Sequence, residues 1–92
     1  MNYNAPMEIG VEISLYPLQA DYIPSVHRFL EDLGAHRGLR VVTNSMSTQV
    51  FGEFGEVMDA LRAALAASFG RLAAASERAA LVVKVIGPLP SA

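Results

Sequence analysis

The sequence of 92 residues contains no cysteine and no tryptophan, and only 17% of its residues are charged. Without cysteine the chain cannot form a disulfide, a thiolate nucleophile or a zinc–thiolate site. Its seven lysines and arginines are scattered, and its formal net charge is −2. Proteins that bind nucleic acid present a basic face to the phosphates. The sequence therefore predicts no nucleic-acid partner.

Long hydrophobic runs are also missing. The first ten residues, MNYNAPMEIG, have neither the basic nor the apolar part of a signal peptide. No apolar stretch approaches the roughly 18 residues that span a bilayer. The segment AALVVKVIG is too short, and Lys84 interrupts it. We therefore expect no membrane insertion and a cytoplasmic location.

Sequence motifs of known chemistry are absent as well. The chain has no G-x-x-x-x-G-K-[ST], no G-x-G-x-x-G and no G-x-S-x-G pattern. His27 and His36 are nine residues apart, with no carboxylate at ligand spacing, so they are interpreted as solvent-facing or helix-end residues. We expect no catalytic residues, no metal, no cofactor and no enzymatic activity.

What the chain does have is apolar content: 52% of its residues are hydrophobic, which excludes a disordered protein. Its length suits one domain over residues 1–92, with a core from about 7 to 87. A domain of this size buries only about 60% of its unfolded surface. Oligomerisation would be a natural way to bury more.

The first half of the chain predicts one strand and one helix. In MEIGVEISLY apolar and other residues alternate strictly, which is typical of a half-buried strand, and Pro17 ends it. Asp21 is a good helix N-cap, and Pro24 is tolerated in a first turn. Apolar residues then recur at helical spacing until Gly34 or Gly38.

The second half predicts a hairpin, a helix and a last strand. LRVVT and MSTQVFG are short β-type runs around Asn44-Ser45. A loop of two or four residues puts Val41 and Thr43 on one face with Met46, Thr48 and Val50, and a three-residue loop would reverse this relation. Residues 52–75 carry a helical stripe, with Glu53 and Glu56 near its start. RAALVVKVIGPLP is the last strand, which Gly87 and the prolines are expected to stop.

The order β-α-β-β-α-β predicts an α+β ferredoxin-like sandwich, in which a four-stranded antiparallel sheet carries both helices on one face. The expected open face mixes apolar and polar side chains. These are Glu12, Ser14, Tyr16, Val42, Ser47, Gln49, Phe51, Val82, Lys84 and Ile86. A face of this kind usually meets a partner. We expect a small-ligand pocket or pairing with further copies of the chain there, as a homodimer or a larger homo-oligomer.

An acylphosphatase shares this strand order but needs an arginine in the loop after the first strand. The segment here, YPLQADY, has none. A small hydrolase or isomerase would also need an acid–base pair, which the sequence does not place.

Two segments resemble a known family. SLYPLQADYIPSVHRFLEDL followed by TNSMSTQVFGEFGEVMDAL is similar to the YkoF-type thiamine/hydroxymethylpyrimidine-binding proteins. The resemblance covers about residues 8–87. Its most specific parts are residues 14–17, Tyr22-Ile23, and Ser47-Thr48 with Gly52.

The resemblance implies a non-enzymatic protein that binds thiamine or its hydroxymethylpyrimidine precursor and supports vitamin salvage or uptake in bacteria. A thiamine-precursor transporter is a partner that this role suggests. Family members often carry two such domains in tandem, whereas this chain has one. The resemblance then implies that two chains pair to rebuild the double-domain arrangement.

The open-face residues suit such a ligand. An aminopyrimidine offers acceptors and one amine donor, which Ser, Gln and Glu side chains can satisfy. Its ring suits stacking on an aromatic side chain, and Glu12 would favour the thiazolium cation of thiamine. The ligand-binding residues that we predict are Glu12, Ser14, Tyr16, Ser47, Thr48, Gln49 and Phe51.

Structural alternatives remain for several of these residues. Glu12 can pair with Lys84 on the neighbouring strand. Tyr16 and Phe51 can anchor a dimer interface, and the hairpin parity puts Thr48 on the helix side. The alternative function is an oligomeric regulatory or interaction module that uses the open face without a small ligand.

Overall fold

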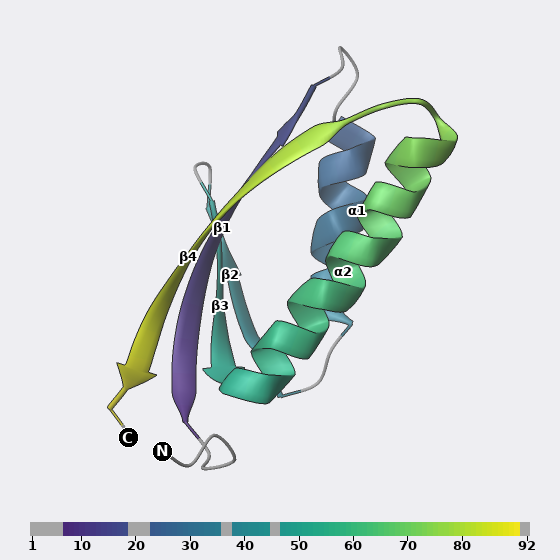
Figure 1. The fold of residues 1–92 in the computed structure, drawn as a ribbon. Helices are drawn as coiled ribbons and strands as arrows, with labels where there is room; N and C mark the ends of the chain where they lie inside the picture. Colours follow the sequence, from purple (N-terminus) through teal and green to yellow (C-terminus); the bar gives the residue numbers. More distant parts are fainter. Residues whose placement is uncertain (1–6, 19–22, 36–37, 45–46, 91–92) are drawn as a thin grey trace.

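A computed structural model describes residues 7–18, 23–35, 38–44 and 47–90 of the chain. Its elements are β1 (Glu8–Pro17), α1 (Ile23–Gly34), β2 (Arg40–Thr43), β3 (Thr48–Glu53), α2 (Phe54–Ala74) and β4 (Ala79–Leu89). The strands form one antiparallel sheet in the order β2-β3-β1-β4, and both helices lie on the same face of it (Figure 1). The predicted ferredoxin-like βαββαβ sandwich is confirmed.

Strand β1 lies in the middle of the sheet because it pairs with β3 on one side and β4 on the other. Its alternation decides which side chains enter the core. Ile9, Val11 and Ile13 are only 2–3% exposed and face the helices. Since successive side chains point to opposite faces, Glu12 and its even-numbered neighbours lie on the open face.

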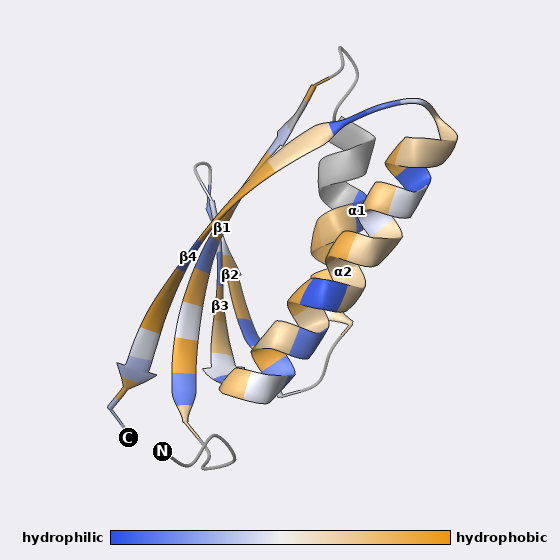
Figure 2. Ribbon diagram, in the orientation of Figure 1, coloured by the Kyte–Doolittle hydropathy of each residue, from blue (hydrophilic) through white to orange (hydrophobic). Residues whose placement is uncertain are grey.

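The helices complete the core with large apolar side chains from both α1 and α2, and α2 adds buried alanines. Phe29 and Leu33 are each 1% exposed, and so are Val57 and Ala64. Alanine in α2 lets the helix approach the sheet and α1 closely. Figure 2 shows that the strands and the helices carry hydrophobic residues along most of their length, broken by polar positions.

Local polar contacts fix the ends and the pairing of the helices. The Glu53 side chain caps α2 by accepting from the backbone N–H of Gly55, a role that satisfies one of the free donors of a helix start. Arg71 of α2 donates to Asp32 of α1 over 2.9 Å. Asp21, the predicted cap of α1, lies outside the described residues.

The β2–β3 hairpin has a loop of four residues, from Asn44 to Ser47. The backbone N–H of Ser47 donates to the Asn44 side chain over 2.9 Å, and the backbone N–H of Asn44 donates to the Ser47 carbonyl over 3.0 Å. Thr43 consequently pairs with Thr48 and Val41 with Val50. The parity predicted for a four-residue loop is confirmed, except for Met46, which is outside the described residues.

The predicted end of the last strand at Gly87 is wrong, because β4 continues to Leu89. The pairing passes from Gly10 opposite Ile86 to Glu8 opposite Leu89, so β4 carries one extra residue as a bulge. Proline removes a donor from a strand, but β4 is an edge strand and Pro88 can leave its outer side unpaired. Within the described residues, neither helix has the length and apolar character needed to cross a bilayer.

Candidate functional site

The open face of the sheet carries a stacked arrangement centred on Phe51. Across the sheet, Arg40, Phe51, Gly10 and Ile86 stand in one row, in the order of the strands β2, β3, β1 and β4. The Arg40 guanidinium carbon lies 4.2 Å from the centre of the Phe51 ring. Such a contact is a cation–π interaction, which holds the ring in place.

Gly10 provides the space on the other side of the ring. A Cβ atom added at Gly10 would lie 3.0 Å from Cε1 and 3.1 Å from Cδ1 of Phe51. Any larger residue would therefore force the Phe51 ring to move. Since Arg40 and Gly10 belong to the two strands that flank β3, one flank of the ring meets the guanidinium and the other faces the glycine.

Two hollows adjoin at Phe51 and Leu89. The first, of about 90 Å³, is lined by Gly10, Glu12, Gln49, Phe51, Ile86 and Leu89. We call it the Glu12 hollow. The second, of about 580 Å³, includes Glu8, Gly38, Arg40, Phe51, Gly52 and Leu89, and we call it the Arg40 hollow. Ligand pockets usually measure 300–1,000 Å³, so the Glu12 hollow alone holds only part of a ligand.

Among the described residues, Glu12 is the one carboxylate that lines the Glu12 hollow. It stands opposite Gln49 on β3 and Lys84 on β4. The Lys84 Nζ atom is 3.8 Å from Glu12 Oε1, and the two side chains are 73% and 36% exposed. The predicted ion pair is therefore present. Exposed pairs of this kind contribute about 0–1 kcal/mol, so the pair leaves the Glu12 carboxylate available to a ligand at little cost.

The predicted site residues are divided between two ends of the face. Glu12, Gln49 and Phe51 meet at the Glu12 hollow. Tyr16 is 55% exposed and pairs with Ala80, six residues beyond Gly10 on β1. Six strand residues span about 20 Å, so Tyr16 and Phe51 cannot stack on the same small ring.

Ser14 and Ser47 lie between these two ends. Ser14 is half-buried and pairs with Val82. Ser47 is half-buried and closes the hairpin loop with its backbone N–H. Neither residue lines the Glu12 hollow or the Arg40 hollow.

Thr48 is not brought together with the other predicted residues. Its side chain is 5% exposed, on the helix-covered face beside Ile13 and Val50. Its Oγ1 atom is 3.2 Å from Oγ1 of Thr43, a hydrogen bond between paired strands. The parity of the hairpin had predicted that Thr48 lies on the helix side of the sheet. In the structure, its side chain links the two strands of the hairpin through the hydrogen bond to Thr43.

Thr48→Ala should therefore lower stability and spare ligand binding. Losing a hydrogen bond and a buried methyl group costs about 1–2 kcal/mol. Urea unfolding of the variant measures this loss, and a titration with ligand checks the second part. A variant that is as stable as the wild type but no longer binds ligand would return Thr48 to the site.

Sequence reasoning missed the contributions of Gly10, Arg40 and Ile86 to the site. The signal for Gly10 was available, because a glycine inside an alternating strand often marks a close approach of another group. Arg40 and Ile86 become neighbours of Gly10 and Phe51 only through the sheet register. That register follows from the four-residue loop and from the order of the strands.

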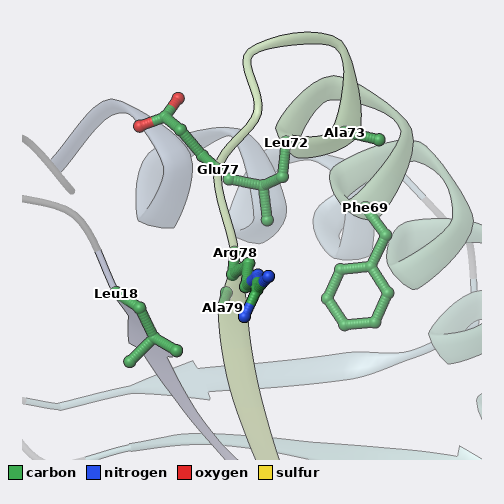
Figure 3. A pocket seen from close by; sticks show the side chains of 7 residues that line it. All are labelled: Leu18, Phe69, Leu72, Ala73, Glu77, Arg78 and Ala79. Carbon is green, nitrogen blue, oxygen red and sulfur yellow. The ribbon is translucent and has the colours of Figure 1, made fainter.

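A further hollow lies where β1 ends and β4 begins, at the C-terminal end of α2. It measures about 300 Å³ and is lined mainly by apolar side chains (Figure 3). In Figure 3, Arg78 lies between Leu18 and Phe69, and the Glu77 carboxylate points away from these three side chains. None of the predicted site residues lines this hollow. In the described part of the chain, no group of three histidine or acidic residues could hold a metal ion, and His36 is outside that part.

Comparisons with known proteins find one family model and several similar structures. The model of the YKOF-related family matches residues 8–85. A hypothetical protein from Methanocaldococcus jannascii has a similar structure, with a TM-score of 0.76, 22% identity, and coverage of 94% of this chain and 86% of its own. A protein from Streptococcus pneumoniae gives a TM-score of 0.77 at 22% identity, over 88% of this chain and 87% of its own.

A candidate thiamine biosynthesis/salvage protein from Thermotoga maritima gives a TM-score of 0.71 at 21% identity. The match covers 85% of this chain and 81% of that protein. Identities this low show a shared fold. No curated protein matches the chain.

Proposed function

The chain belongs to the YKOF-related family, and from this we propose that it binds thiamine or its hydroxymethylpyrimidine precursor without carrying out a reaction on it. A structural neighbour from T. maritima is named for thiamine biosynthesis or salvage, which supports the same ligand class. The proposed role is salvage or uptake of the vitamin in the cytoplasm. A thiamine-precursor transporter is the proposed source of the ligand.

The observation that carries this proposal is the grouping of Glu12, Gln49 and Phe51 around one hollow. The Glu12 carboxylate accepts hydrogen bonds from the exocyclic amine of an aminopyrimidine, and the Gln49 amide both donates and accepts. The two residues are directly opposite each other on β1 and β3. The edge of one ring can thus contact both side chains.

Next to Glu12 and Gln49, the neighbouring row of residues across the sheet can contact the flat faces of a ligand ring. Phe51 and Ile86 stand on either side of Gly10, so two strand spacings, or about 10 Å, separate their backbones. Aromatic and aliphatic side chains at that spacing can enclose a flat ring over the glycine. The thiazolium cation of thiamine would also gain from the Glu12 carboxylate and the Phe51 ring.

Calorimetric titration tests the proposal with three ligands. Thiamine and hydroxymethylpyrimidine should both bind, because both carry the aminopyrimidine. The thiamine analogue with an oxo group in place of the amine should bind at least about tenfold more weakly, since it offers no amine to Glu12. Equal affinities for thiamine and the analogue, or no detectable binding of any of the three ligands, would contradict the proposal.

We further propose that a second copy of the chain covers the open face. Several large apolar side chains on this face are exposed: Tyr16 by 55%, Val42 by 39%, Val82 by 50% and Ile86 by 59%. Tyr16 lies at the end of the face away from the Glu12 hollow, and Val82 lies two residues nearer to it, opposite Ser14. Contact there would bury apolar surface, and the partner chain would add a wall to a hollow that is small and open in one chain.

Val82→Glu should convert the dimer to a monomer, because it places a carboxylate in the proposed contact. Sedimentation velocity at micromolar concentration measures the change. Val85→Glu is the matched control, since Val85 lies on the same strand and is 54% exposed but is on the opposite face. A monomeric wild type, or dissociation caused by Val85→Glu alone, would contradict pairing through the open face.

A further inference from the structure

The Arg40 hollow differs from the Glu12 hollow in its charge. Among the described residues that line it, Arg40 is the only positively charged one and Glu8 the only acidic one. The Glu56 carboxylate is also near, since a Cβ atom added at the lining residue Gly38 would lie 2.9 Å from Glu56 Oε2. The two hollows share Phe51 and Leu89 as lining residues, so they lie next to each other on either side of the Phe51 side chain.

Within the part of the chain that the structure describes, no hydrogen bond or ion pair involves the Arg40 guanidinium. Its central carbon lies 4.2 Å from the centre of the Phe51 ring, a cation–π contact that does not require any of its five N–H groups. Among the described residues, the ion pairs are those of Arg71 with Asp32 and of Lys84 with Glu12, and Arg40 takes part in neither. Stacking on Phe51 also limits the number of conformations that a binding event must fix.

We propose that the Arg40 hollow receives the phosphate group of a phosphorylated form of the ligand, such as thiamine monophosphate, with Arg40 as the residue that binds the phosphate. This inference rests on the proposed function, in which the aminopyrimidine lies beside Glu12. Gln49 and Phe51 are two residues apart on β3, a step of about 7 Å. The pyrimidine of such an ester and its phosphate lie at opposite ends of the molecule, and Glu12 and Arg40 line different members of this pair of neighbouring hollows.

The chemistry of arginine favours this assignment. A guanidinium binds the oxygens of a phosphate through two parallel hydrogen bonds, and both partners are charged. Glu8 lines the same hollow and repels a phosphate, so the net preference for the phosphorylated ligand is moderate. Removing the Glu8 charge with Glu8→Gln should strengthen that preference.

Titrations with thiamine and thiamine monophosphate test the inference. The wild type should bind the monophosphate about tenfold more tightly than thiamine, as expected for one charged hydrogen-bonding partner. Arg40→Gln should weaken the monophosphate about tenfold more than it weakens thiamine, while Arg40→Lys keeps part of the preference because it keeps the charge. Arg62→Gln is the control, since Arg62 is an exposed arginine on α2, in the helical layer.

Competition with inorganic phosphate shows whether the phosphate group causes the preference for thiamine monophosphate. Inorganic phosphate should compete with the monophosphate and leave thiamine binding unchanged, because thiamine itself leaves the Arg40 hollow without an anion. Equal affinity for both ligands in the wild type, or a preference that survives Arg40→Gln, overturns the phosphate site and leaves the proposed function standing. Absence of binding by both ligands overturns the proposed function and this inference together.

Discussion

Replacing Gly10 by valine is expected to weaken ligand binding by about 100-fold while the fold persists. A Cβ atom added at this position would lie 3.0 Å from Phe51 and 3.8 Å from Leu89. The two valine methyl groups would then occupy the Glu12 hollow. Overpacking costs of 1–3 kcal/mol correspond to roughly a 10- to 100-fold loss of affinity. The Phe51 ring must also move away from Gly10, so we expect a loss of affinity at the upper end of this range. Calorimetric titration with thiamine measures the loss.

The control for this change is Ala66→Val. Ala66 is exposed on α2, in the helical layer, and it lines neither hollow. Valine suits a strand at position 10 and costs less than about 1 kcal/mol on a helix surface, so circular dichroism should report a folded protein for both variants. If Gly10→Val bound thiamine with the affinity of the wild type, the ligand could not lie over Gly10.

The second large effect is expected from Glu12→Gln, which keeps the size of the side chain and removes its charge. A hydrogen bond to a charged group contributes about 1.5–3 kcal/mol, so the affinity for thiamine should fall roughly 10- to 100-fold. Hydroxymethylpyrimidine carries no permanent cation and should lose less. The fold should tolerate the change, because Lys84 is 73% exposed and water replaces its partner.

Asp59→Asn is the matched control for the loss of one carboxylate. Asp59 is exposed on α2, in the layer on the other side of the sheet. Titration of both variants with thiamine should show a loss for Glu12→Gln alone. Equal losses in the two variants would mean that the net charge of the chain matters and the position of Glu12 does not.

The alternation in the first strand was enough to predict which face of the sheet each of its residues occupies. One face of β1 must enter the core, so a shift by a single residue would bury Glu12 and expose Ile13. The hairpin left two parities open, and the Asn44–Ser47 loop decided between them. The end of β4 was not predictable from Gly87 and Pro88 alone, because a proline on an edge strand does not interrupt the sheet.

The candidate site was only partly predictable for a different reason. Glu12, Gln49 and Phe51 could be placed on one face by their position in the strands. The distance of Gln49 and Phe51 from Tyr16 depends on the pairing between β1 and β3, which sequence periodicity does not give. The contact of Arg40 with Phe51 could not be predicted for the same reason, because it follows from the register that places Arg40 opposite Phe51.

A crystal structure of the protein with thiamine would show whether the ligand lies on the open face of the sheet. We expect the aminopyrimidine over Gly10, with its amine within hydrogen-bond distance of Glu12 and its ring against Phe51. A ligand bound in the apolar hollow between Leu18 and Phe69, or anywhere on the helical side of the sheet, would contradict this expectation.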